Sequence, residues 1–184
     1  MLKRFFLNCN SGISRSRVKE IVNEHGQNVL IGIDPGSSDR PDEGARETID
    51  AVKIVGARLH VYLVGPGMMS WSEGERNQIK FLARSVGIDT NSSNWHNVWT
   101  KVGWRKKNLQ QFYYYCKHFN AYSCEIDNID SSTIGNDPEE TVKFYTELKN
   151  SLQKYSIPTK LMIKNLDEDQ LRAVIDAGFD TSFL

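Results

Sequence analysis

Three carboxylates and an amide fall within six positions near the middle of the chain and are the clearest candidates for chemistry. The stretch AYSCEIDNID, residues 121–130, begins like a buried strand and then ends in Glu125, Asp127, Asn128 and Asp130. Side chains alternate along a strand, so we expect Glu125 and Asp127 on one face and Ile126 on the other, toward a layer of helices. One Asp or Asn is enough for an ordinary turn, so this group predicts a functional site.

Other apolar runs of strand length also end in polar residues. Asn8 lies near the end of residues 4–9, Asp34 ends residues 28–34, and Lys164 and Asn165 end residues 159–165. In parallel βα folds, ligands bind at the carboxyl ends of the strands. We therefore expect these side chains to converge on one edge of a sheet.

Paired carboxylates at such an edge suit the hydrolysis of a glycosidic bond. That reaction needs one carboxylic acid to protonate the leaving oxygen and a second carboxylate to act as nucleophile or to activate water. We predict Glu125 as the general acid and Asp34 as the base or nucleophile, with Asp127 as the second choice. The alternative is that Asp34 and Asp127 only bind loop backbone. The predicted substrate contacts are Asn8, Trp71, Trp99, Asn128, Lys164 and Asn165, and no metal or cofactor is implied.

The elements that must position these residues alternate regularly along the chain. Six strand-like runs are separated by helix-like stretches of 12 to 19 residues, which predicts a parallel sheet with helical crossovers. We expect a compact (β/α) barrel-like sheet, either incomplete or with seven to eight strands, and an open doubly wound sheet as the second choice. One further weak strand is predicted near residues 98–102. The predicted strands are 4–9, 28–34, 58–65, 121–127, 159–165 and 180–184, and the predicted helices are 14–26, 41–56, 72–87, 106–119, 137–155 and 167–178.

Residues with capping preferences mark the helix ends. Ser, Asp and Pro favour the first turn of a helix, and Gly favours the position after the last turn. The predicted N-caps are Ser14 or Ser16, Asp137 and Asp167, and the predicted C-caps are Gly26, Gly56, Gly87 and Gly178.

Residues 85–105 break this rhythm, because they hold Trp95, Trp99, Trp104 and His96 with little periodicity. We expect a long loop. Its aromatic rings either plug the rim of a barrel or form a stacking platform for sugar or base faces.

Composition restricts the class of protein. The 184 residues carry 23 basic and 23 acidic side chains, so no net field favours nucleic acid. No apolar run approaches the 18 residues of a membrane span, and the start of the chain is too short in apolar residues for a signal peptide. The three cysteines lack metal-ligand spacing, so we expect reduced, buried thiols. We expect a single catalytic domain over residues 1–184, monomeric and synthesised in the cytoplasm.

The segment CEIDNID also resembles a known motif. It is similar to the Glu-x-Asp-Asn-x-Asp that ends a strand in glycoside hydrolase family 114, the endo-α-1,4-polygalactosaminidase-like TIM barrels. RLHVYLVGPGMMSW, residues 58–71, resembles that family's third strand with its following Trp. LMIKN, residues 161–165, resembles its next strand, with Lys164 and Asn165 as the Lys-Asn pair. The similarity covers most of residues 29–184, but KVGWR lacks the Asp that the family carries there.

The resemblance implies a barrel glycosidase that acts on an amino-sugar polysaccharide, with Glu125 and either Asp34 or Asp127 as the catalytic pair. A trimmed enzyme without an export signal suits a bacteriophage endolysin. Its partner would be peptidoglycan or another polysaccharide, and its site of action the bacterial cell wall.

Two alternatives remain open. GIDPGS, residues 32–37, also opens the Holliday-junction resolvases of the ribonuclease H-like fold, in which Asp34, Glu125 and Asp127 would bind Mg²⁺. That fold requires a β-hairpin after the Asp strand, whereas residues 41–56 have a helical pattern, and the neutral charge suits DNA poorly. The other alternative is a carbohydrate-binding barrel without activity, which would use the tryptophans but has no need of converging carboxylates.

Overall fold

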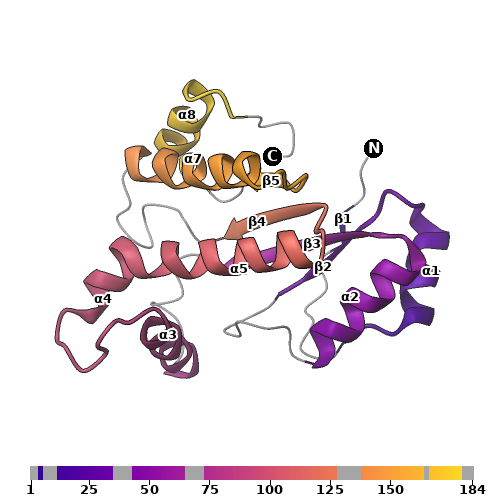
Figure 1. Cartoon of the computed structure of the whole chain (residues 1–184), viewed down its shortest axis with the longest axis horizontal. Helices are drawn as coiled ribbons and strands as arrows, with labels where there is room; N and C mark the ends of the chain where they lie inside the picture. The colour runs from indigo at the N-terminus through magenta and orange to yellow at the C-terminus, as the bar shows by residue number, and fades with distance from the viewer. Residues whose placement is uncertain are drawn as a thin grey trace.

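A computed structural model describes residues 4–5, 12–34, 43–64, 73–127, 138–163 and 166–179. It is a mixed α/β structure in which helices connect the strands of one sheet (Figure 1). The strands are β1 (Arg4–Phe5), β2 (Leu30–Ile33), β3 (Arg58–Val64), β4 (Ser123–Asp127) and β5 (Lys160–Ile163). The helices are α1 (Arg15–His25), α2 (Glu43–Val55), α3 (Glu73–Ser85), α4 (Trp95–Val98), the π-helix η3 (Trp99–Gly103), α5 (Trp104–His118), α7 (Pro138–Lys154) and α8 (Glu168–Asp176).

All strand pairs in the described sheet are parallel, which confirms that part of the prediction. The strands lie in the order β1-β2-β3-β4-β5, the same as their order in the chain. A doubly wound sheet reverses its strand order at a switch point. The described strands contain no such reversal, so they do not support our second choice of fold.

The sheet has one apolar face, which packs against helices. Leu59, Val61 and Leu63 alternate along β3, are at most 5% exposed, and belong to the same core cluster as Cys124 and Ile126 of β4. Helix α5 runs along β3 and β4 (Figure 1). Burial of these side chains, each contributing roughly 1.5–3 kcal/mol, is the main force that holds helix to sheet.

Helix ends follow the predicted capping residues where the structure describes them. Ser14, and not Ser16, caps α1 by accepting a hydrogen bond from Arg17 N. Asp167 caps α8 in a reciprocal capping box with Gln170. The four predicted glycines have φ between 76° and 87° just after their helices. Asn120 and Ser156 take the same left-handed conformation after α5 and α7, at φ 52°, where no glycine marked the turn.

The segment predicted as a loop is non-helical only over residues 86–94. Residues 95–105 are helical, so the loop prediction was wrong there, as was the weak strand predicted near residues 98–102. Residues 95–118 form α4, η3 and α5 without a break. Trp99 and Trp104 are five positions apart, a spacing that does not fit an α-helix. The π-turn, in which Trp104 N donates to Trp99 O, brings both rings to the buried side. A Cβ on Gly103 would fall within 2.7 Å of the Trp99 ring, so this close packing needs glycine.

In the part of the chain that the structure describes, no helix is long and apolar enough to cross a lipid bilayer.

Candidate functional site

The face of the sheet opposite α5 carries polar side chains from two neighbouring strands. On β3 these are His60 and Tyr62, and on β4 they are Ser123 and Glu125. The register places His60 beside Ser123 and Tyr62 beside Glu125. His60, Ser123 and Glu125 are each at most 1% exposed. We call these four residues the polar face.

His60 links the two polar residues of β4. Its Nδ1 lies 2.8 Å from Ser123 Oγ, a hydrogen bond in which the donor depends on the tautomer of the ring. Its Nε2 lies 3.6 Å from Glu125 Oε2. The second distance exceeds a hydrogen bond but is short enough for electrostatic interaction. The imidazole is therefore held between a hydroxyl and a carboxyl group.

Such a group is costly to bury. When a carboxyl, an imidazole and a hydroxyl group are buried, they lose their hydrogen bonds to water. Only interactions with one another or with other protein groups can replace those bonds. Proteins break the rule of an apolar interior mostly where function requires it. The burial of Glu125 and His60 together thus marks the polar face as the best candidate for a functional site in the described structure.

The other face of β4 is chemically different. Cys124 is fully buried against Cys116 of α5, and both are free thiols, as predicted. Burial, then the hydrogen bond and charge of Cys116, and then the charge of Glu125, raise the pKa of Cys124 well above its usual range. The Cys124 thiol therefore stays protonated at neutral pH, and both side chains serve as apolar packing. Cys9 lies outside the described residues.

Asp34 follows the last residue of β2 and is partly buried. The register pairs Gly32 with His60 and Ile33 with Val61. If the alternation continues for one residue, Asp34 falls beside Tyr62 and therefore in the same row as Glu125. Two strand spacings separate the backbones in this row, about 10 Å. Tyr62 lies between Asp34 and Glu125 in this row, so a sugar flanked by the two carboxyl groups would have to lie over the Tyr62 side chain.

The remaining predicted site residues divide into two groups. The backbone of Asp127 ends β4, but its side chain lies outside the described residues, as do Asn8, Trp71, Asn128, Lys164 and Asn165. Trp99 is described and is only 2% exposed, within the core cluster. Its ring packs in the core, so the described structure gives no support to its assignment as a substrate contact. Trp95 and Trp104 are buried in the same way, at 5% and 1%.

His60, Tyr62 and Ser123 were not predicted. The signal was present in the strand RLHVYLV, where His60 and Tyr62 alternate with Leu59, Val61 and Leu63. A central strand of a parallel sheet is usually apolar on both faces, because helices cover both. The strict alternation in β3 therefore indicated that the side chains on one face of this strand do more than pack against helices.

A search for metal-binding groups and a comparison with known proteins both gave negative results. Among the residues that the structure describes, no three His, Cys, Asp or Glu side chains are grouped so as to hold a metal ion. A scan against protein-family models and a search of the curated proteins found no match to this chain.

Proposed function

We propose that this protein is a glycoside hydrolase in which Glu125 is the general acid. The observation that carries the proposal is the burial of Glu125 on a polar sheet face, beside His60 and in register with the end of β2, where Asp34 lies. Two carboxyl groups from different strands of a parallel sheet, near its carboxyl edge, are the minimum that this reaction needs.

We propose further that the sheet belongs to a (β/α) barrel. Five parallel strands in chain order, with helices on the face opposite the polar one, match the way in which such a barrel is wound. In a barrel the polar face would line the interior, and the carboxyl ends of β2 and β4 would form its mouth.

The mechanism assigns one role to each group. Glu125 gives its proton to the glycosidic oxygen as the bond to the sugar carbon breaks. Asp34, or Asp127 as the second choice, either attacks that carbon or takes a proton from the attacking water. His60 is a positioning residue: Ser123 fixes its ring, and the ring in turn fixes Glu125. Because Glu125 is 1% exposed, the mechanism requires the polar face to open to admit a sugar.

The substrate class is proposed from the resemblance of residues 124–130 and 161–165 to glycoside hydrolase family 114. It is an amino-sugar polysaccharide or the peptidoglycan of a bacterial cell wall, as for a bacteriophage endolysin. Asn128, Lys164 and Asn165, which follow strand-like runs in the sequence, would contact the sugar.

The described structure gives less support to the two alternatives. A ribonuclease H-like nuclease needs an antiparallel hairpin after Asp34, but β2 is joined through α2 to β3, which is parallel to it. A carbohydrate-binding barrel would use exposed tryptophans, but Trp95, Trp99 and Trp104 are all buried.

The test is release of soluble sugar from purified bacterial cell walls and from amino-sugar exopolysaccharides, in EDTA. We expect release by the wild type, none by Glu125→Gln, and normal release by Glu147→Gln, the same change at an exposed position on α7. Equal release by the wild type and Glu125→Gln would show that Glu125 is structural. No release by any of the three would favour a binding protein or a nuclease, for which junction DNA with Mg²⁺ is the next substrate.

A further inference from the structure

A pocket lies at the opposite edge of the sheet from the carboxyl ends of β2 and β4. Its volume is about 480 Å³, within the range of sites for small molecules. Arg58, the first residue of β3, and Tyr122, just before β4, form one side of it. Lys53 of α2 and His118 of α5 contribute from the last turns of their helices. We call it the lower pocket.

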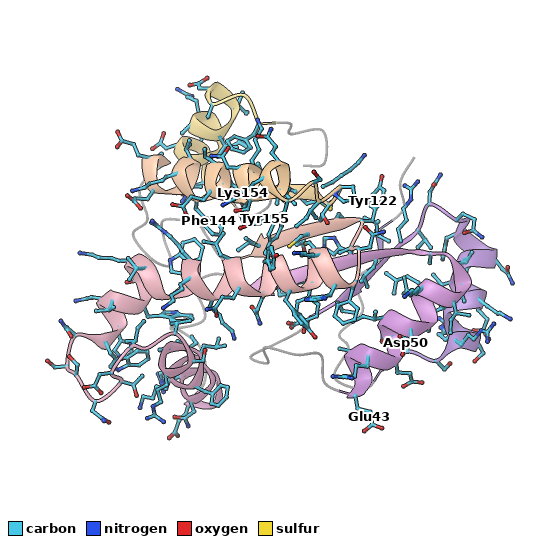
Figure 2. All side chains as sticks on the ribbon, viewed as in Figure 1. Glu43, Asp50, Tyr122, Phe144, Lys154 and Tyr155 are labelled. Carbon is cyan, nitrogen blue, oxygen red and sulfur yellow. The ribbon has the colours of Figure 1, made fainter. Side chains whose placement is uncertain are left out.

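The charges around the lower pocket have one sign. Lys53, Arg58 and His118 line it, and none of the described residues that line it is acidic. None of these three forms an ion pair with any residue in the described ranges. The nearest acid along α2 is Asp50 (labelled in Figure 2). It comes three residues before Lys53 in the sequence and does not line the pocket. In a chain with no net charge, this local excess of cations is a distinct feature.

Arg58 is held in a way that leaves its donors available. Its guanidinium carbon lies 4.3 Å from the centroid of the Tyr122 ring. A cation–π contact of this kind uses no N–H group as a hydrogen-bond donor to an oxygen or nitrogen acceptor. The N–H groups of the guanidinium can bind a carboxylate or a phosphate by two parallel hydrogen bonds.

The helix ends explain only part of this arrangement. Cations are stabilised near helix C-termini, which accounts for Lys53 on α2. Arg58 lies on a strand, so the helix dipoles do not account for its position. The rest of the wall is mostly apolar and includes Phe119 and Leu59. A cationic rim over an apolar wall suits a ligand that has both properties.

We propose that the lower pocket binds a small organic anion with a flat apolar body, such as a ring that carries a phosphate or a carboxylate. Arg58 binds the anionic group, Lys53 adds to the positive potential, and the apolar wall accepts the ring. This site is independent of the proposed hydrolase site, because it lies at the other edge of the sheet and shares no residue with the polar face.

The experiment uses the ¹⁵N-labelled full chain and follows backbone amide shifts during a titration with phenyl phosphate. We expect saturable shifts at Arg58, Asn120 and Tyr122, and weaker binding of inorganic phosphate and of benzyl alcohol, which each carry half of the recognised chemistry. Phenylacetate in place of phenyl phosphate then shows whether the site prefers a carboxylate or a phosphate.

Three variants decide the result. Arg58→Gln should weaken phenyl phosphate binding tenfold or more, about the effect of losing a charge-assisted hydrogen bond. Arg15→Gln, the same change at an exposed position on α1, should leave the affinity unchanged. Lys53→Gln should weaken it by a smaller factor. Lys53 is exposed on α2, so this variant is expected to fold even if Arg58→Gln does not.

Several outcomes would overturn the proposal. The first is an unchanged affinity for phenyl phosphate in Arg58→Gln, or in Lys53→Gln if Arg58→Gln does not fold. The second is amide shifts that are scattered over exposed lysines and do not saturate. Binding of benzyl alcohol as tight as that of phenyl phosphate would show an apolar pocket with no preference for anions. Absence of shifts with phenyl phosphate would also reject the site.

Discussion

The two faces of strand β4 differ in chemistry although their residues alternate along five positions. Ser123 and Glu125 meet His60 on one face. Cys124 and Ile126 belong to the apolar core cluster on the other. Both sets are buried to the same degree, at 1% exposure or less. Burial alone therefore does not separate a packing role from a functional role in this strand.

What separates the two faces is whether burial is favourable. Removing the methyl groups of Ile126 from water stabilises the fold, whereas removing the carboxyl group of Glu125 from water opposes folding unless other groups compensate. We therefore expect substitutions on the apolar face to lower stability and substitutions on the polar face to lower activity. The following predictions test that division.

The largest expected effect is on activity in Glu125→Gln. The amide keeps the shape of the side chain but cannot give up a proton, so activity should fall by about 10² to 10⁴-fold, the usual contribution of a general acid. Stability, measured by urea unfolding, should change little or rise, because a buried ionisable group is replaced by a neutral one. A folded variant with full activity would remove the distinction between the two faces.

The adjacent substitution Ile126→Ala should have the opposite effect. Ile126 is 1% exposed in the core cluster, and the loss of its methyl groups leaves a cavity. We expect the free energy of unfolding to fall by about 2–5 kcal/mol. Activity per folded molecule should stay within a few-fold of the wild type. Loss of activity in a variant that unfolds at the wild-type urea concentration would contradict this prediction.

The sequence predicted the sheet better than it predicted the site, for a physical reason. Strand β4 was predicted correctly because the alternation of Ser123, Cys124, Glu125 and Ile126 is local, and helix ends were predicted because Gly26 and Asp167 cap through local geometry. The contact of His60 with Glu125 joins residues 65 positions apart. It depends on the register of β3 with β4, which no local pattern specifies.

The prediction for the tryptophan segment, residues 85–105, was wrong in part for a related reason. Trp99 and Trp104 share a buried side only because a π-turn inserts one extra residue between them. The spacing therefore resembles neither a strand nor an α-helix, and the sequence left open whether the rings pack against the fold or bind a ligand. The close approach at Gly103 was equally invisible, since it involves Ile88, fifteen positions earlier.

A third prediction concerns His60, whose two ring nitrogens face different partners. Asn places its amide near the position of Nδ1, beside Ser123, and Gln reaches the position of Nε2, toward Glu125. If His60 acts through Glu125, His60→Asn should lower activity by about tenfold to hundredfold, as for a catalytic group displaced by about 1 Å. His60→Gln should lose less, and both variants should change the shape of the pH–activity profile, because each replaces the imidazole beside Glu125 by an amide that does not titrate.

Equal losses in His60→Asn and His60→Gln, with the wild-type pH profile in both, would contradict this role. His60 would then be a structural member of the polar face. Unfolding curves recorded for both variants separate a loss of stability from a loss of positioning.

The smallest effect is expected on the apolar face, in the pH dependence of stability. The folded-state pKa of Cys124 is raised above its unfolded value, chiefly by burial. The stability that comes from the protonated thiol is therefore complete below the unfolded pKa, and it is lost as pH rises above about 9 toward the folded value. One proton changes the free energy of unfolding by at most about 1.4 kcal/mol per pH unit.

Cys124→Ala removes the contribution of this thiol. The free energy of unfolding of the variant should therefore fall less steeply with rising pH than that of the wild type, between pH 8.5 and about 10. At pH 7 it should be roughly 1 kcal/mol less stable, because of the small cavity. Urea unfolding at several pH values, in reductant, measures both quantities, and the titration of tyrosines cancels in the comparison. Parallel curves for the two proteins would mean that the Cys124 thiol ionises as readily in the folded chain as in the unfolded one. The apolar character that we assign to this face of β4 would then be wrong.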